Sequence, residues 1–243
     1  MSDTDNFQSE ILLSICVAIY NIKEEFLRAC IESIMVDMSA GTELILGDDC
    51  SNEKTAEICR EYAEKDCRIQ YVRPPKNGGV SYIRNVMINR AKGKMITFID
   101  GDDIAANGYS AALCSAFDSS DREYDIVMFK WQRFDSIVPN IKIEDGKITA
   151  IPQSAAQRFS QACLTGAPPN AKDYGICDST PSSVCIKAYR REFLIENNLK
   201  FKVGLKKSQD VEFNTRAFFV CKSLGYMARV LYLYRNNPES VTN

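Results

Sequence analysis

The first half of the chain alternates short apolar runs with amphipathic runs, and this alternation limits the fold more than any other feature. The apolar runs are rich in β-branched residues, which is typical of buried strands, while the amphipathic runs repeat apolar residues at helical spacing. Strands are predicted at 13–19, 43–46, 68–72 and 94–99, and helices at 24–36, 55–65 and 80–90. This order predicts an α/β/α sandwich with a mixed, mostly parallel central sheet.

The second half is less regular. Strands are predicted at 126–133, 183–186 and 226–234, helices at 154–164, 190–197 and 211–224, and a loop at 167–180. A length of 243 residues suits one large domain. We therefore expect a polar tail over residues 1–10, followed by two halves, 11–104 and 105–243, that share a single globule.

Composition excludes several classes of function. The chain has no histidine, which excludes histidine bases, histidine triads and histidine-ligated metals. A formal net charge of -2 gives no electrostatic reason to bind nucleic acid, and we expect no nucleic-acid partner. No apolar run approaches the ~20 residues that span a bilayer, so we expect no transmembrane segment, while peripheral contact with a membrane stays open.

The ten cysteines show no C-x-x-C spacing, which disfavours a zinc ribbon or a dithiol redox site. Several, including Cys16 and Cys221, lie in apolar runs, where a free thiol packs as a small hydrophobe. The N-terminal residues are polar and acidic and do not resemble a secretory signal. These features predict reduced cysteines in a cytoplasmic protein, with attachment at the inner face of the membrane left open.

Parallel sheets bind ligands beyond the carboxyl ends of their strands. Three segments occupy such positions here, at 18–21, 47–51 and 100–103. The last of them, Asp100-Gly101-Asp102-Asp103, crowds carboxylates that repel one another unless a cation or donors compensate. Oxygen ligands of this kind suit Mn²⁺ or Mg²⁺, often with substrate phosphates completing the shell. A metal site and a structural role, in which Asp103 caps the next helix, both fit this segment.

Further carboxylates have two interpretations each. Asp48 and Asp49 follow the second predicted strand and could form a turn that leads into the next helix. Asp210 precedes an apolar helix, where it could be an N-cap or a general base. Trp131, the only tryptophan, lies in a strand-like run, and we expect it to pack in the core.

Taken together, seven segments resemble the motifs of family 2 glycosyltransferases, in the family's order. They are SICVAIYN at 14–21, LRACIESI at 27–34, LILGDDCSNEKT at 44–55, NGGVSYIRN at 77–85, GKMITFIDGDD at 93–103, SQDVEFNTR at 208–216 and YLYRNNPESVT at 232–242. Each match is weak alone, but their order and their span make the resemblance specific.

The resemblance implies a GT-A fold, which is a Rossmann-like α/β sandwich. It implies an inverting, metal-dependent hexosyltransferase that uses Mn²⁺ or Mg²⁺ and moves a sugar from a nucleotide-sugar, commonly a UDP-sugar, to an acceptor hydroxyl. The expected acceptor is a saccharide or a lipid-linked saccharide, in bacterial polysaccharide or glycoconjugate synthesis. Residues 11–104 would then form the nucleotide-sugar-binding half, and 105–243 the acceptor-side half with the catalytic base.

The matched motifs also imply a role for individual residues. Asp210 would be the catalytic base, and Asp102 with Asp100 would bind the metal. The nucleotide-sugar site would be formed by Ala18, Ile19, Tyr20, Asp49, Arg84, Asp100 and Gly101, with Asp49 hydrogen-bonding the uracil. Asp48 and Asp103 would be supporting residues.

The chain departs from the family pattern at several positions. Ala18 stands where proline is common, Cys50 replaces a glycine and Gln209 replaces a glutamate before the base, while residues 105–108 replace a W-x-P segment. If the position of Cys50 needs a positive φ, a residue other than glycine is disfavoured there. Two alternatives remain at this point: a catalytically inactive nucleotide-sugar-binding relative, and a nucleotidyltransferase of similar fold. The second lacks support, because no glycine-rich phosphate loop follows the first strand.

Overall fold

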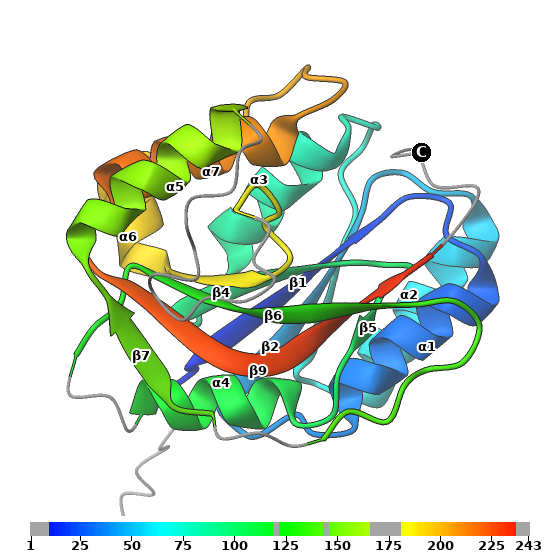
Figure 1. Ribbon diagram of the computed structural model, residues 1–243. Coiled ribbons are helices and arrows are strands. Elements are labelled where there is room, and N and C mark those ends of the chain that lie inside the picture. The colour runs from blue at the N-terminus through cyan, green and yellow to red at the C-terminus, as the bar shows by residue number, and fades with distance from the viewer. Residues whose placement is uncertain (1–9, 119–121, 143–145, 166–180, 237–243) are drawn as a thin grey trace, which may run out of the picture.

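The computed structural model describes residues 10–118, 122–142, 146–165 and 181–236. Its centre is one nine-stranded sheet in the order β3-β2-β1-β4-β8-β6-β9-β5, with β7 also paired to β9 (Figure 1). The strands are β1 (Leu13–Ile19), β2 (Thr42–Asp48), β3 (Ile69–Val72), β4 (Met95–Asp100), β5 (Ile104–Ala105), β6 (Ile126–Phe134), β7 (Ile148–Ile151), β8 (Lys187–Arg190) and β9 (Leu224–Arg235).

Helices cover both faces of this sheet. They are α1 (Glu24–Met35), α2 (Glu53–Lys65), α3 (Val80–Arg90), α4 (Tyr109–Asp118), α5 (Gln153–Thr165), α6 (Arg191–Glu196) and α7 (Gln209–Val220). In Figure 1, α1, α2 and α4 lie below the sheet and α3, α5, α6 and α7 lie above it. The predicted α/β/α sandwich is therefore confirmed.

The strand directions bring most carboxyl ends to one edge of the sheet. β1 pairs in parallel with β2 and β4, and β2 pairs in parallel with β3. β8 is antiparallel to both β4 and β6, so β4 and β6 run the same way, and β9 is parallel to β6. Side chains at the ends of β1, β2, β4, β6 and β9 thus share one edge, which is where such sheets bind ligands.

Most of the predicted elements are present, with shifts of a few residues at their ends. The strand predicted at 183–186 is wrong, because β8 begins only at Lys187. The preceding segment is diverted by side-chain bonds: the Val184 N–H donates to Asp210, and Asn214 donates to the Ser182 carbonyl. β5, β7 and α4 were not predicted, since the strands are very short and α4 is buried around most of its circumference. The loop predicted at 167–180 lies outside the described residues.

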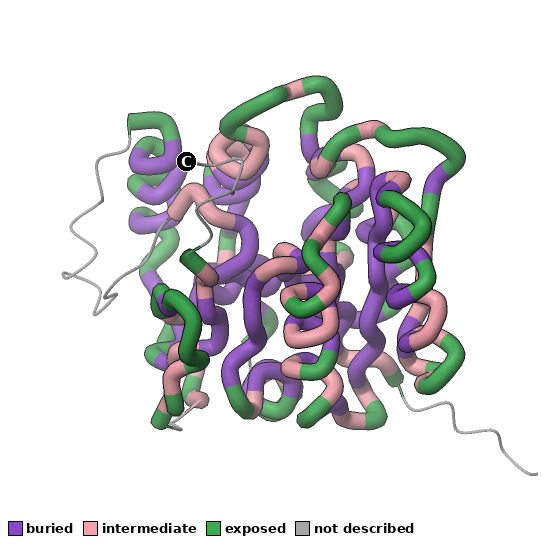
Figure 2. Tube along the Cα trace, turned by 90° about the vertical axis from the view of Figure 1, so that its right-hand side faces the viewer, coloured by how far each residue is buried: buried purple, intermediate pink, exposed green. Residues whose placement is uncertain are grey.

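The core fills the space between the sheet and the two helix layers. Buried residues run along the central strands, while exposed ones lie on the loops and the outer helix faces (Figure 2). At Gly47 on β2 a β-carbon would lie 2.5 Å from the Met87 sulfur, so glycine lets α3 pack close to the sheet. The nine described cysteines are free, as predicted. Among the described residues, no helix combines the length and the apolar character needed to cross a bilayer.

Candidate active site

Backbone hydrogen bonds tie the acidic turn after β4 to the neighbouring strand. The Gly101 N–H donates to the carbonyl of Ala18 at the end of β1, across 3.0 Å. A β-carbon at Gly101 would lie only 3.2 Å from that oxygen, so a larger residue would push the turn away. Within the turn, the Asp103 N–H donates to the Asp100 carbonyl across 3.0 Å. The carboxylates are thereby held at the ligand-binding edge.

One buried guanidinium connects two of the predicted site residues. Arg84 lies on α3, and its side chain is 4% exposed. Its Nη2 donates to Asp100 Oδ1 across 2.9 Å, and its Nη1 donates to Asp210 Oδ1 across 2.6 Å. Burial alone would lower the pKa of Arg84, but the negative charges of Asp210 and Asp100 raise it above its usual value. Arg84 therefore holds two carboxylates together, and its contact with a nucleotide stays a prediction.

Asp210 lies in the first turn of α7, one residue past the helix start. Ser208 occupies the N-cap position, so Asp210 is not the N-cap. Its second carboxylate oxygen accepts the N–H of Val184 across 3.0 Å. The segment carrying Val184 is itself bound to α7, because Asn214 Nδ2 donates to the Ser182 carbonyl across 2.7 Å. The Asp210 side chain keeps an exposed fraction of 28%, so it is held in place and still reached from solvent.

Asp103 is the buried member of the acidic turn. It accepts hydrogen bonds from the Tyr232 hydroxyl and from the Arg235 N–H, the latter across 2.7 Å. Burial, and after it the negative charge of Asp100, raises the pKa of Asp103 to about 8. The interpretation of Asp103 as a helix cap is wrong, because α4 begins only at Tyr109 and the carboxylate binds groups of β9 instead.

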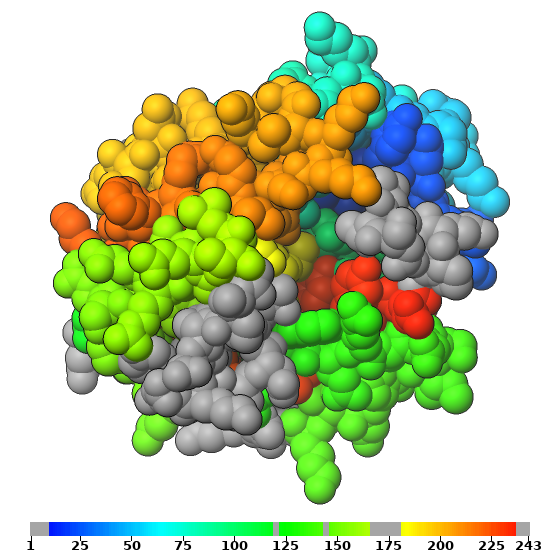
Figure 3. Space-filling view, turned by 45° about the horizontal axis from the view of Figure 1, so that its top comes forward, coloured from blue at the N-terminus to red at the C-terminus, as the bar shows by residue number. Residues whose placement is uncertain are grey.

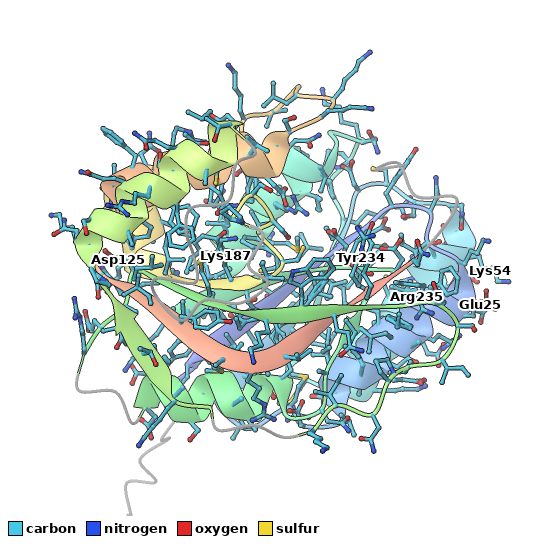
Figure 4. The ribbon with its side chains drawn as sticks, in the orientation of Figure 1. Glu25, Lys54, Asp125, Lys187, Tyr234 and Arg235 are labelled. Atoms are coloured by element: carbon cyan, nitrogen blue, oxygen red, sulfur yellow. The ribbon has the colours of Figure 1, made fainter. Side chains whose placement is uncertain are left out.

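Arg235 fastens the end of β9 to the same turn. Its Nε donates to the Asp102 carbonyl across 2.8 Å. The guanidinium lies between two aromatic rings, 4.4 Å from the centroid of Phe26 and 4.7 Å from that of Phe134. In Figure 4 the labelled Arg235 lies toward α1, at the right-hand end of the sheet. The backbone that presents Asp102 is therefore braced from the final strand.

The nucleotide-side prediction centres on Asp49, which is 2% exposed. Its two carboxylate oxygens accept the N–H groups of Gly78 and Gly79, across 2.8 and 2.6 Å. Its backbone is engaged as well, because Asn77 Nδ2 donates to its carbonyl across 2.8 Å. Asp49 thus organises the glycine turn that opens α3. A hydrogen bond to uracil would use the remaining acceptor capacity of these oxygens, and it stays a prediction.

Asp48 is fully buried, and both of its carboxylate oxygens accept hydrogen bonds. One oxygen accepts the Ser51 N–H across 2.8 Å, which forms the turn expected from the sequence. The other accepts the Tyr71 hydroxyl across 2.7 Å and Arg73 Nη1 across 2.8 Å. Such a saturated carboxylate fits the supporting role expected for Asp48.

Three residues expected in the nucleotide-sugar site differ in exposure. Ile19 is buried, Ala18 is half-buried, and Tyr20 is 53% exposed. Nearby, Cys50 has φ of +62°, so it occupies the left-handed conformation that favours the family's glycine. The departure at Cys50 therefore leaves backbone strain at this turn.

Hydrogen bonds link these residues to one another. The Asp49 N–H donates to the Ile19 carbonyl, and the Gly101 N–H donates to the Ala18 carbonyl, so both acidic turns are fixed to adjacent residues of β1. Arg84 then connects Asp100 to Asp210. Figure 3 shows the surface hollowed between the loop near residues 200–208, in orange, and the end of β9, in red.

The donor groups around the turn fit a divalent cation only in part. Among the described residues there is no group of three or more His, Cys, Asp and Glu side chains placed to hold a metal. Asp103 is engaged by β9. Asp100 is paired with Arg84 but its side chain is 41% exposed, and Asp102 is half-buried. Two carboxylates fit Mn²⁺ or Mg²⁺ when the phosphates of a substrate complete the shell.

Several residues of the site were missed by the sequence analysis. Val184 contributes only a backbone N–H, which no side-chain pattern can predict. Tyr232 was quoted in a motif, but its bond to Asp103 joins residues 129 positions apart. Lys187 is fully buried beneath this site, and nothing in its strand-like surroundings marks it as a buried charge.

Comparison with known proteins adds independent information. The profile of the family described as "Glycosyl transferase family 2" matches residues 14–167. The chain is 30% identical over 232 residues to the uncharacterized glycosyltransferase EpsJ of Bacillus subtilis (strain 168), a match that covers 95% of this chain and 63% of EpsJ. It therefore spans less than two thirds of this relative's length.

Solved structures share the fold. S. aureus TarS 1-349 in complex with UDP-GlcNAc superposes with a TM-score of 0.72 at 21% identity, covering 94% of this chain and 60% of that one. GalNAc-T7 with UDP, GalNAc and Mn²⁺ superposes with a TM-score of 0.65 at 16% identity, covering 96% and 45%. The predicted GT-A sandwich is confirmed by these likenesses.

Proposed function

Since this chain belongs to glycosyl transferase family 2, we propose that it transfers a sugar from a UDP-sugar to an acceptor hydroxyl, with inversion at the anomeric carbon. The proposal draws support from TarS, which was solved with UDP-GlcNAc, and from GalNAc-T7, which was solved with UDP. We place the reaction in bacterial polysaccharide or glycoconjugate synthesis in the cytoplasm, with a saccharide or lipid-linked saccharide as acceptor.

In this mechanism Asp210 is the general base. Its carboxylate removes the proton of the acceptor hydroxyl while the acceptor oxygen attacks the anomeric carbon, and the bond from that carbon to the diphosphate breaks. Arg84 and the Val184 N–H each occupy one oxygen of Asp210, which fixes the carboxylate's orientation. Its partial exposure leaves room for an acceptor to approach.

The acidic turn would serve the leaving group. Asp102, with Asp100, would hold Mn²⁺ or Mg²⁺. Such an ion, when bound, acts as a Lewis acid that stabilises the negative charge developing on the diphosphate. Arg84 compensates part of the charge of Asp100, and Arg235 holds the Asp102 backbone, so the turn is ordered before substrate arrives. On the donor side, Asp49 orders the glycine turn at the start of α3.

The observation that carries this proposal is the double ion pair of Arg84. It joins a carboxylate of the acidic turn to a carboxylate at the start of α7. Residues from 11–104 and from 105–243 thus meet at one guanidinium, which supports a donor site and an acceptor site that lie beside each other.

The test is the release of UDP from a panel of UDP-sugars, with and without saccharide acceptors, in the presence of Mn²⁺. We expect release with at least one donor, and a strong reduction in Asp210→Asn. One departure from the family pattern supports the alternative of a catalytically inactive relative, namely Gln209 in place of a glutamate before the base. Gln209 Nε2 donates to the Leu205 carbonyl across 2.8 Å, so this residue also has a structural role. Binding of UDP-sugars without any UDP release would favour that alternative.

A further inference from the structure

An aromatic pair lies at the ligand-binding edge beside the acidic turn. Trp131 on β6 and Tyr234 on β9 meet edge to face, with ring centroids 6.2 Å apart and an interplanar angle of 83°. Both are half-buried, so the sequence expectation that Trp131 packs in the core holds only in part. In Figure 4, Tyr234 lies above the sheet, on the side of α3 and α7, whereas Arg235 lies toward α1.

The strand neighbours of this pair bind the acidic turn. Trp131 is in register with Tyr232, whose hydroxyl donates to Asp103. Tyr234 precedes Arg235, which binds both Asp103 and the Asp102 carbonyl. The aromatic pair therefore lies next to the acidic turn.

The pair also lies away from the proposed nucleotide side. Asp49 follows β2, and the sheet order places β1, β4 and β8 between β2 and β6. A nucleobase bound near Asp49 would thus be on the opposite side of the acidic turn from the aromatic rings. This position favours a ligand other than the base.

The surroundings of the pair suit a carbohydrate. Arg133 is exposed, and its guanidinium lies 5.7 Å from the Trp131 centroid and 5.5 Å from the Tyr234 centroid. Exposed cation–π contacts are weak, so Arg133 can move off the aromatic rings and leave a ring face open to a ligand. Its N–H groups can then bind a hydroxyl or carboxylate of that ligand. Within the described part of the chain, the buried Trp131 Nε1 has no hydrogen-bond partner, although such donors are normally paired.

We propose that Trp131 and Tyr234 form the acceptor subsite, on which a saccharide ring stacks with its hydroxyls or acidic groups toward Arg133. A sugar offers an apolar C–H face to the rings and polar groups at its rim, which matches this combination of side chains. The inference rests on the proposed function, because it assigns the acceptor to one side of the acidic turn and the donor to the other.

The test uses Trp131 as its own probe, since it is the only tryptophan in the chain. Tryptophan emission is recorded while the protein is titrated to tens of millimolar with glucose, galactose and N-acetylglucosamine methyl glycosides and their 4-linked trisaccharides. UDP with Mn²⁺ is a separate arm. We expect a saturable change with at least one saccharide, and a change that persists when UDP and Mn²⁺ are already bound.

Two variants make the result specific. Tyr234→Leu should weaken the affinity for the saccharide, taken from the emission titration, by roughly tenfold. Gln132→Ala, at an exposed neighbouring position, should leave this affinity unchanged. Two results overturn the proposal: no saccharide changes the tryptophan emission of the wild-type protein, or a saturating concentration of UDP abolishes the change that a saccharide causes. The fluorescence measurement needs no turnover. A saccharide response without UDP release would support the acceptor subsite and not the proposed transfer activity, and UDP release without a saccharide response would support the activity and not the subsite.

Discussion

Arg84 Nη1 lies 2.6 Å from Asp210 Oδ1, although the two residues are 126 positions apart in the sequence. The bond joins α3, which opens at the glycine turn held by Asp49, to the first turn of α7. The same guanidinium binds Asp100, so it sets the separation of two carboxylates with different proposed roles.

Replacing this guanidinium should destabilise the fold. In Arg84→Met, Asp100 and Asp210 would face each other without a compensating cation. Breaking fully buried pairs costs about 3–5 kcal/mol, but both carboxylates are partly exposed, so we expect a loss of about 1–3 kcal/mol in the free energy of unfolding. Urea denaturation measures this loss.

Two controls refine that experiment. Arg84→Lys should recover only part of the loss, since one ammonium cannot reproduce the fork that reaches two carboxylates. Arg90→Met, at an exposed position on the same helix, should change stability little. An Arg84→Met protein as stable as the wild type would contradict the structural role of the double ion pair.

Asp210→Asn should reduce sugar transfer while UDP still binds. An amide keeps hydrogen-bonding capacity at this position but cannot take a proton from the acceptor, and a general base typically contributes ~10²–10⁴-fold in rate. UDP release gives the rate, and calorimetry with UDP and Mn²⁺ gives the binding. Glu212→Gln, on the same helix and paired with Arg216, is the matched control and should stay active. Near-normal transfer by Asp210→Asn would remove the base assignment.

Asp102→Ala should weaken UDP binding only when a divalent cation is present. Its carboxylate is one of two proposed cation ligands, so its loss removes the additional affinity that Mn²⁺ confers and leaves metal-free binding little changed. Titration calorimetry with and without Mn²⁺ separates the two quantities. Glu57→Ala, an exposed position on α2, should retain the full Mn²⁺ effect. Equal Mn²⁺ effects in the Asp102 variant and the wild type would argue against Asp102 as a ligand.

Helices and strands could be predicted where the apolar residues follow a clear periodic pattern. β1 was predicted with its observed ends, because a continuous β-branched run bounded by polar residues has few other interpretations. The 183–186 segment has similar local character, yet α7 diverts it through bonds from Asn214 and to Asp210. Contacts between residues so far apart in the sequence cannot be predicted from the local sequence pattern.

For the candidate site, the sequence indicates which residues lie near strand and helix ends, while the roles of these residues stay predictions. The order of acidic motifs placed Asp49, Asp102 and Asp210 at strand or helix ends that meet at one edge. The double ion pair of Arg84 could not be predicted, since it depends on the packing of α3 against α7. A positive φ at Cys50 was considered only as a condition, because glycine is the residue type that favours it, and the structure has such a φ there.

Lys187 is a fully buried lysine next to the segment that supports Asp210. Its ammonium donates to the Ser183 carbonyl and lies 5.7 Å from the ring centroid of Phe218, and Figure 4 shows it deep between the sheet and the upper helices. Burial lowers the pKa of Lys187 to about 8, while the nearby Cys163, Asp210 and Cys185 act in the opposite direction. The ammonium form is therefore less favourable in the folded protein than in the unfolded chain.

This shift predicts a pH dependence of stability with a definite sign. Unfolded lysine titrates near pH ~10.4, so between about pH 8 and 10 the unfolded chain binds a proton that the folded chain has released. Stability contributed by this group must rise with pH across that window, by about 2 kcal/mol. In Lys187→Met the rise is absent, and titrations common to both proteins cancel in the difference between their unfolding free energies. Urea denaturation at several pH values measures this difference; parallel curves for the two proteins would show that Lys187 keeps an ordinary pKa when folded.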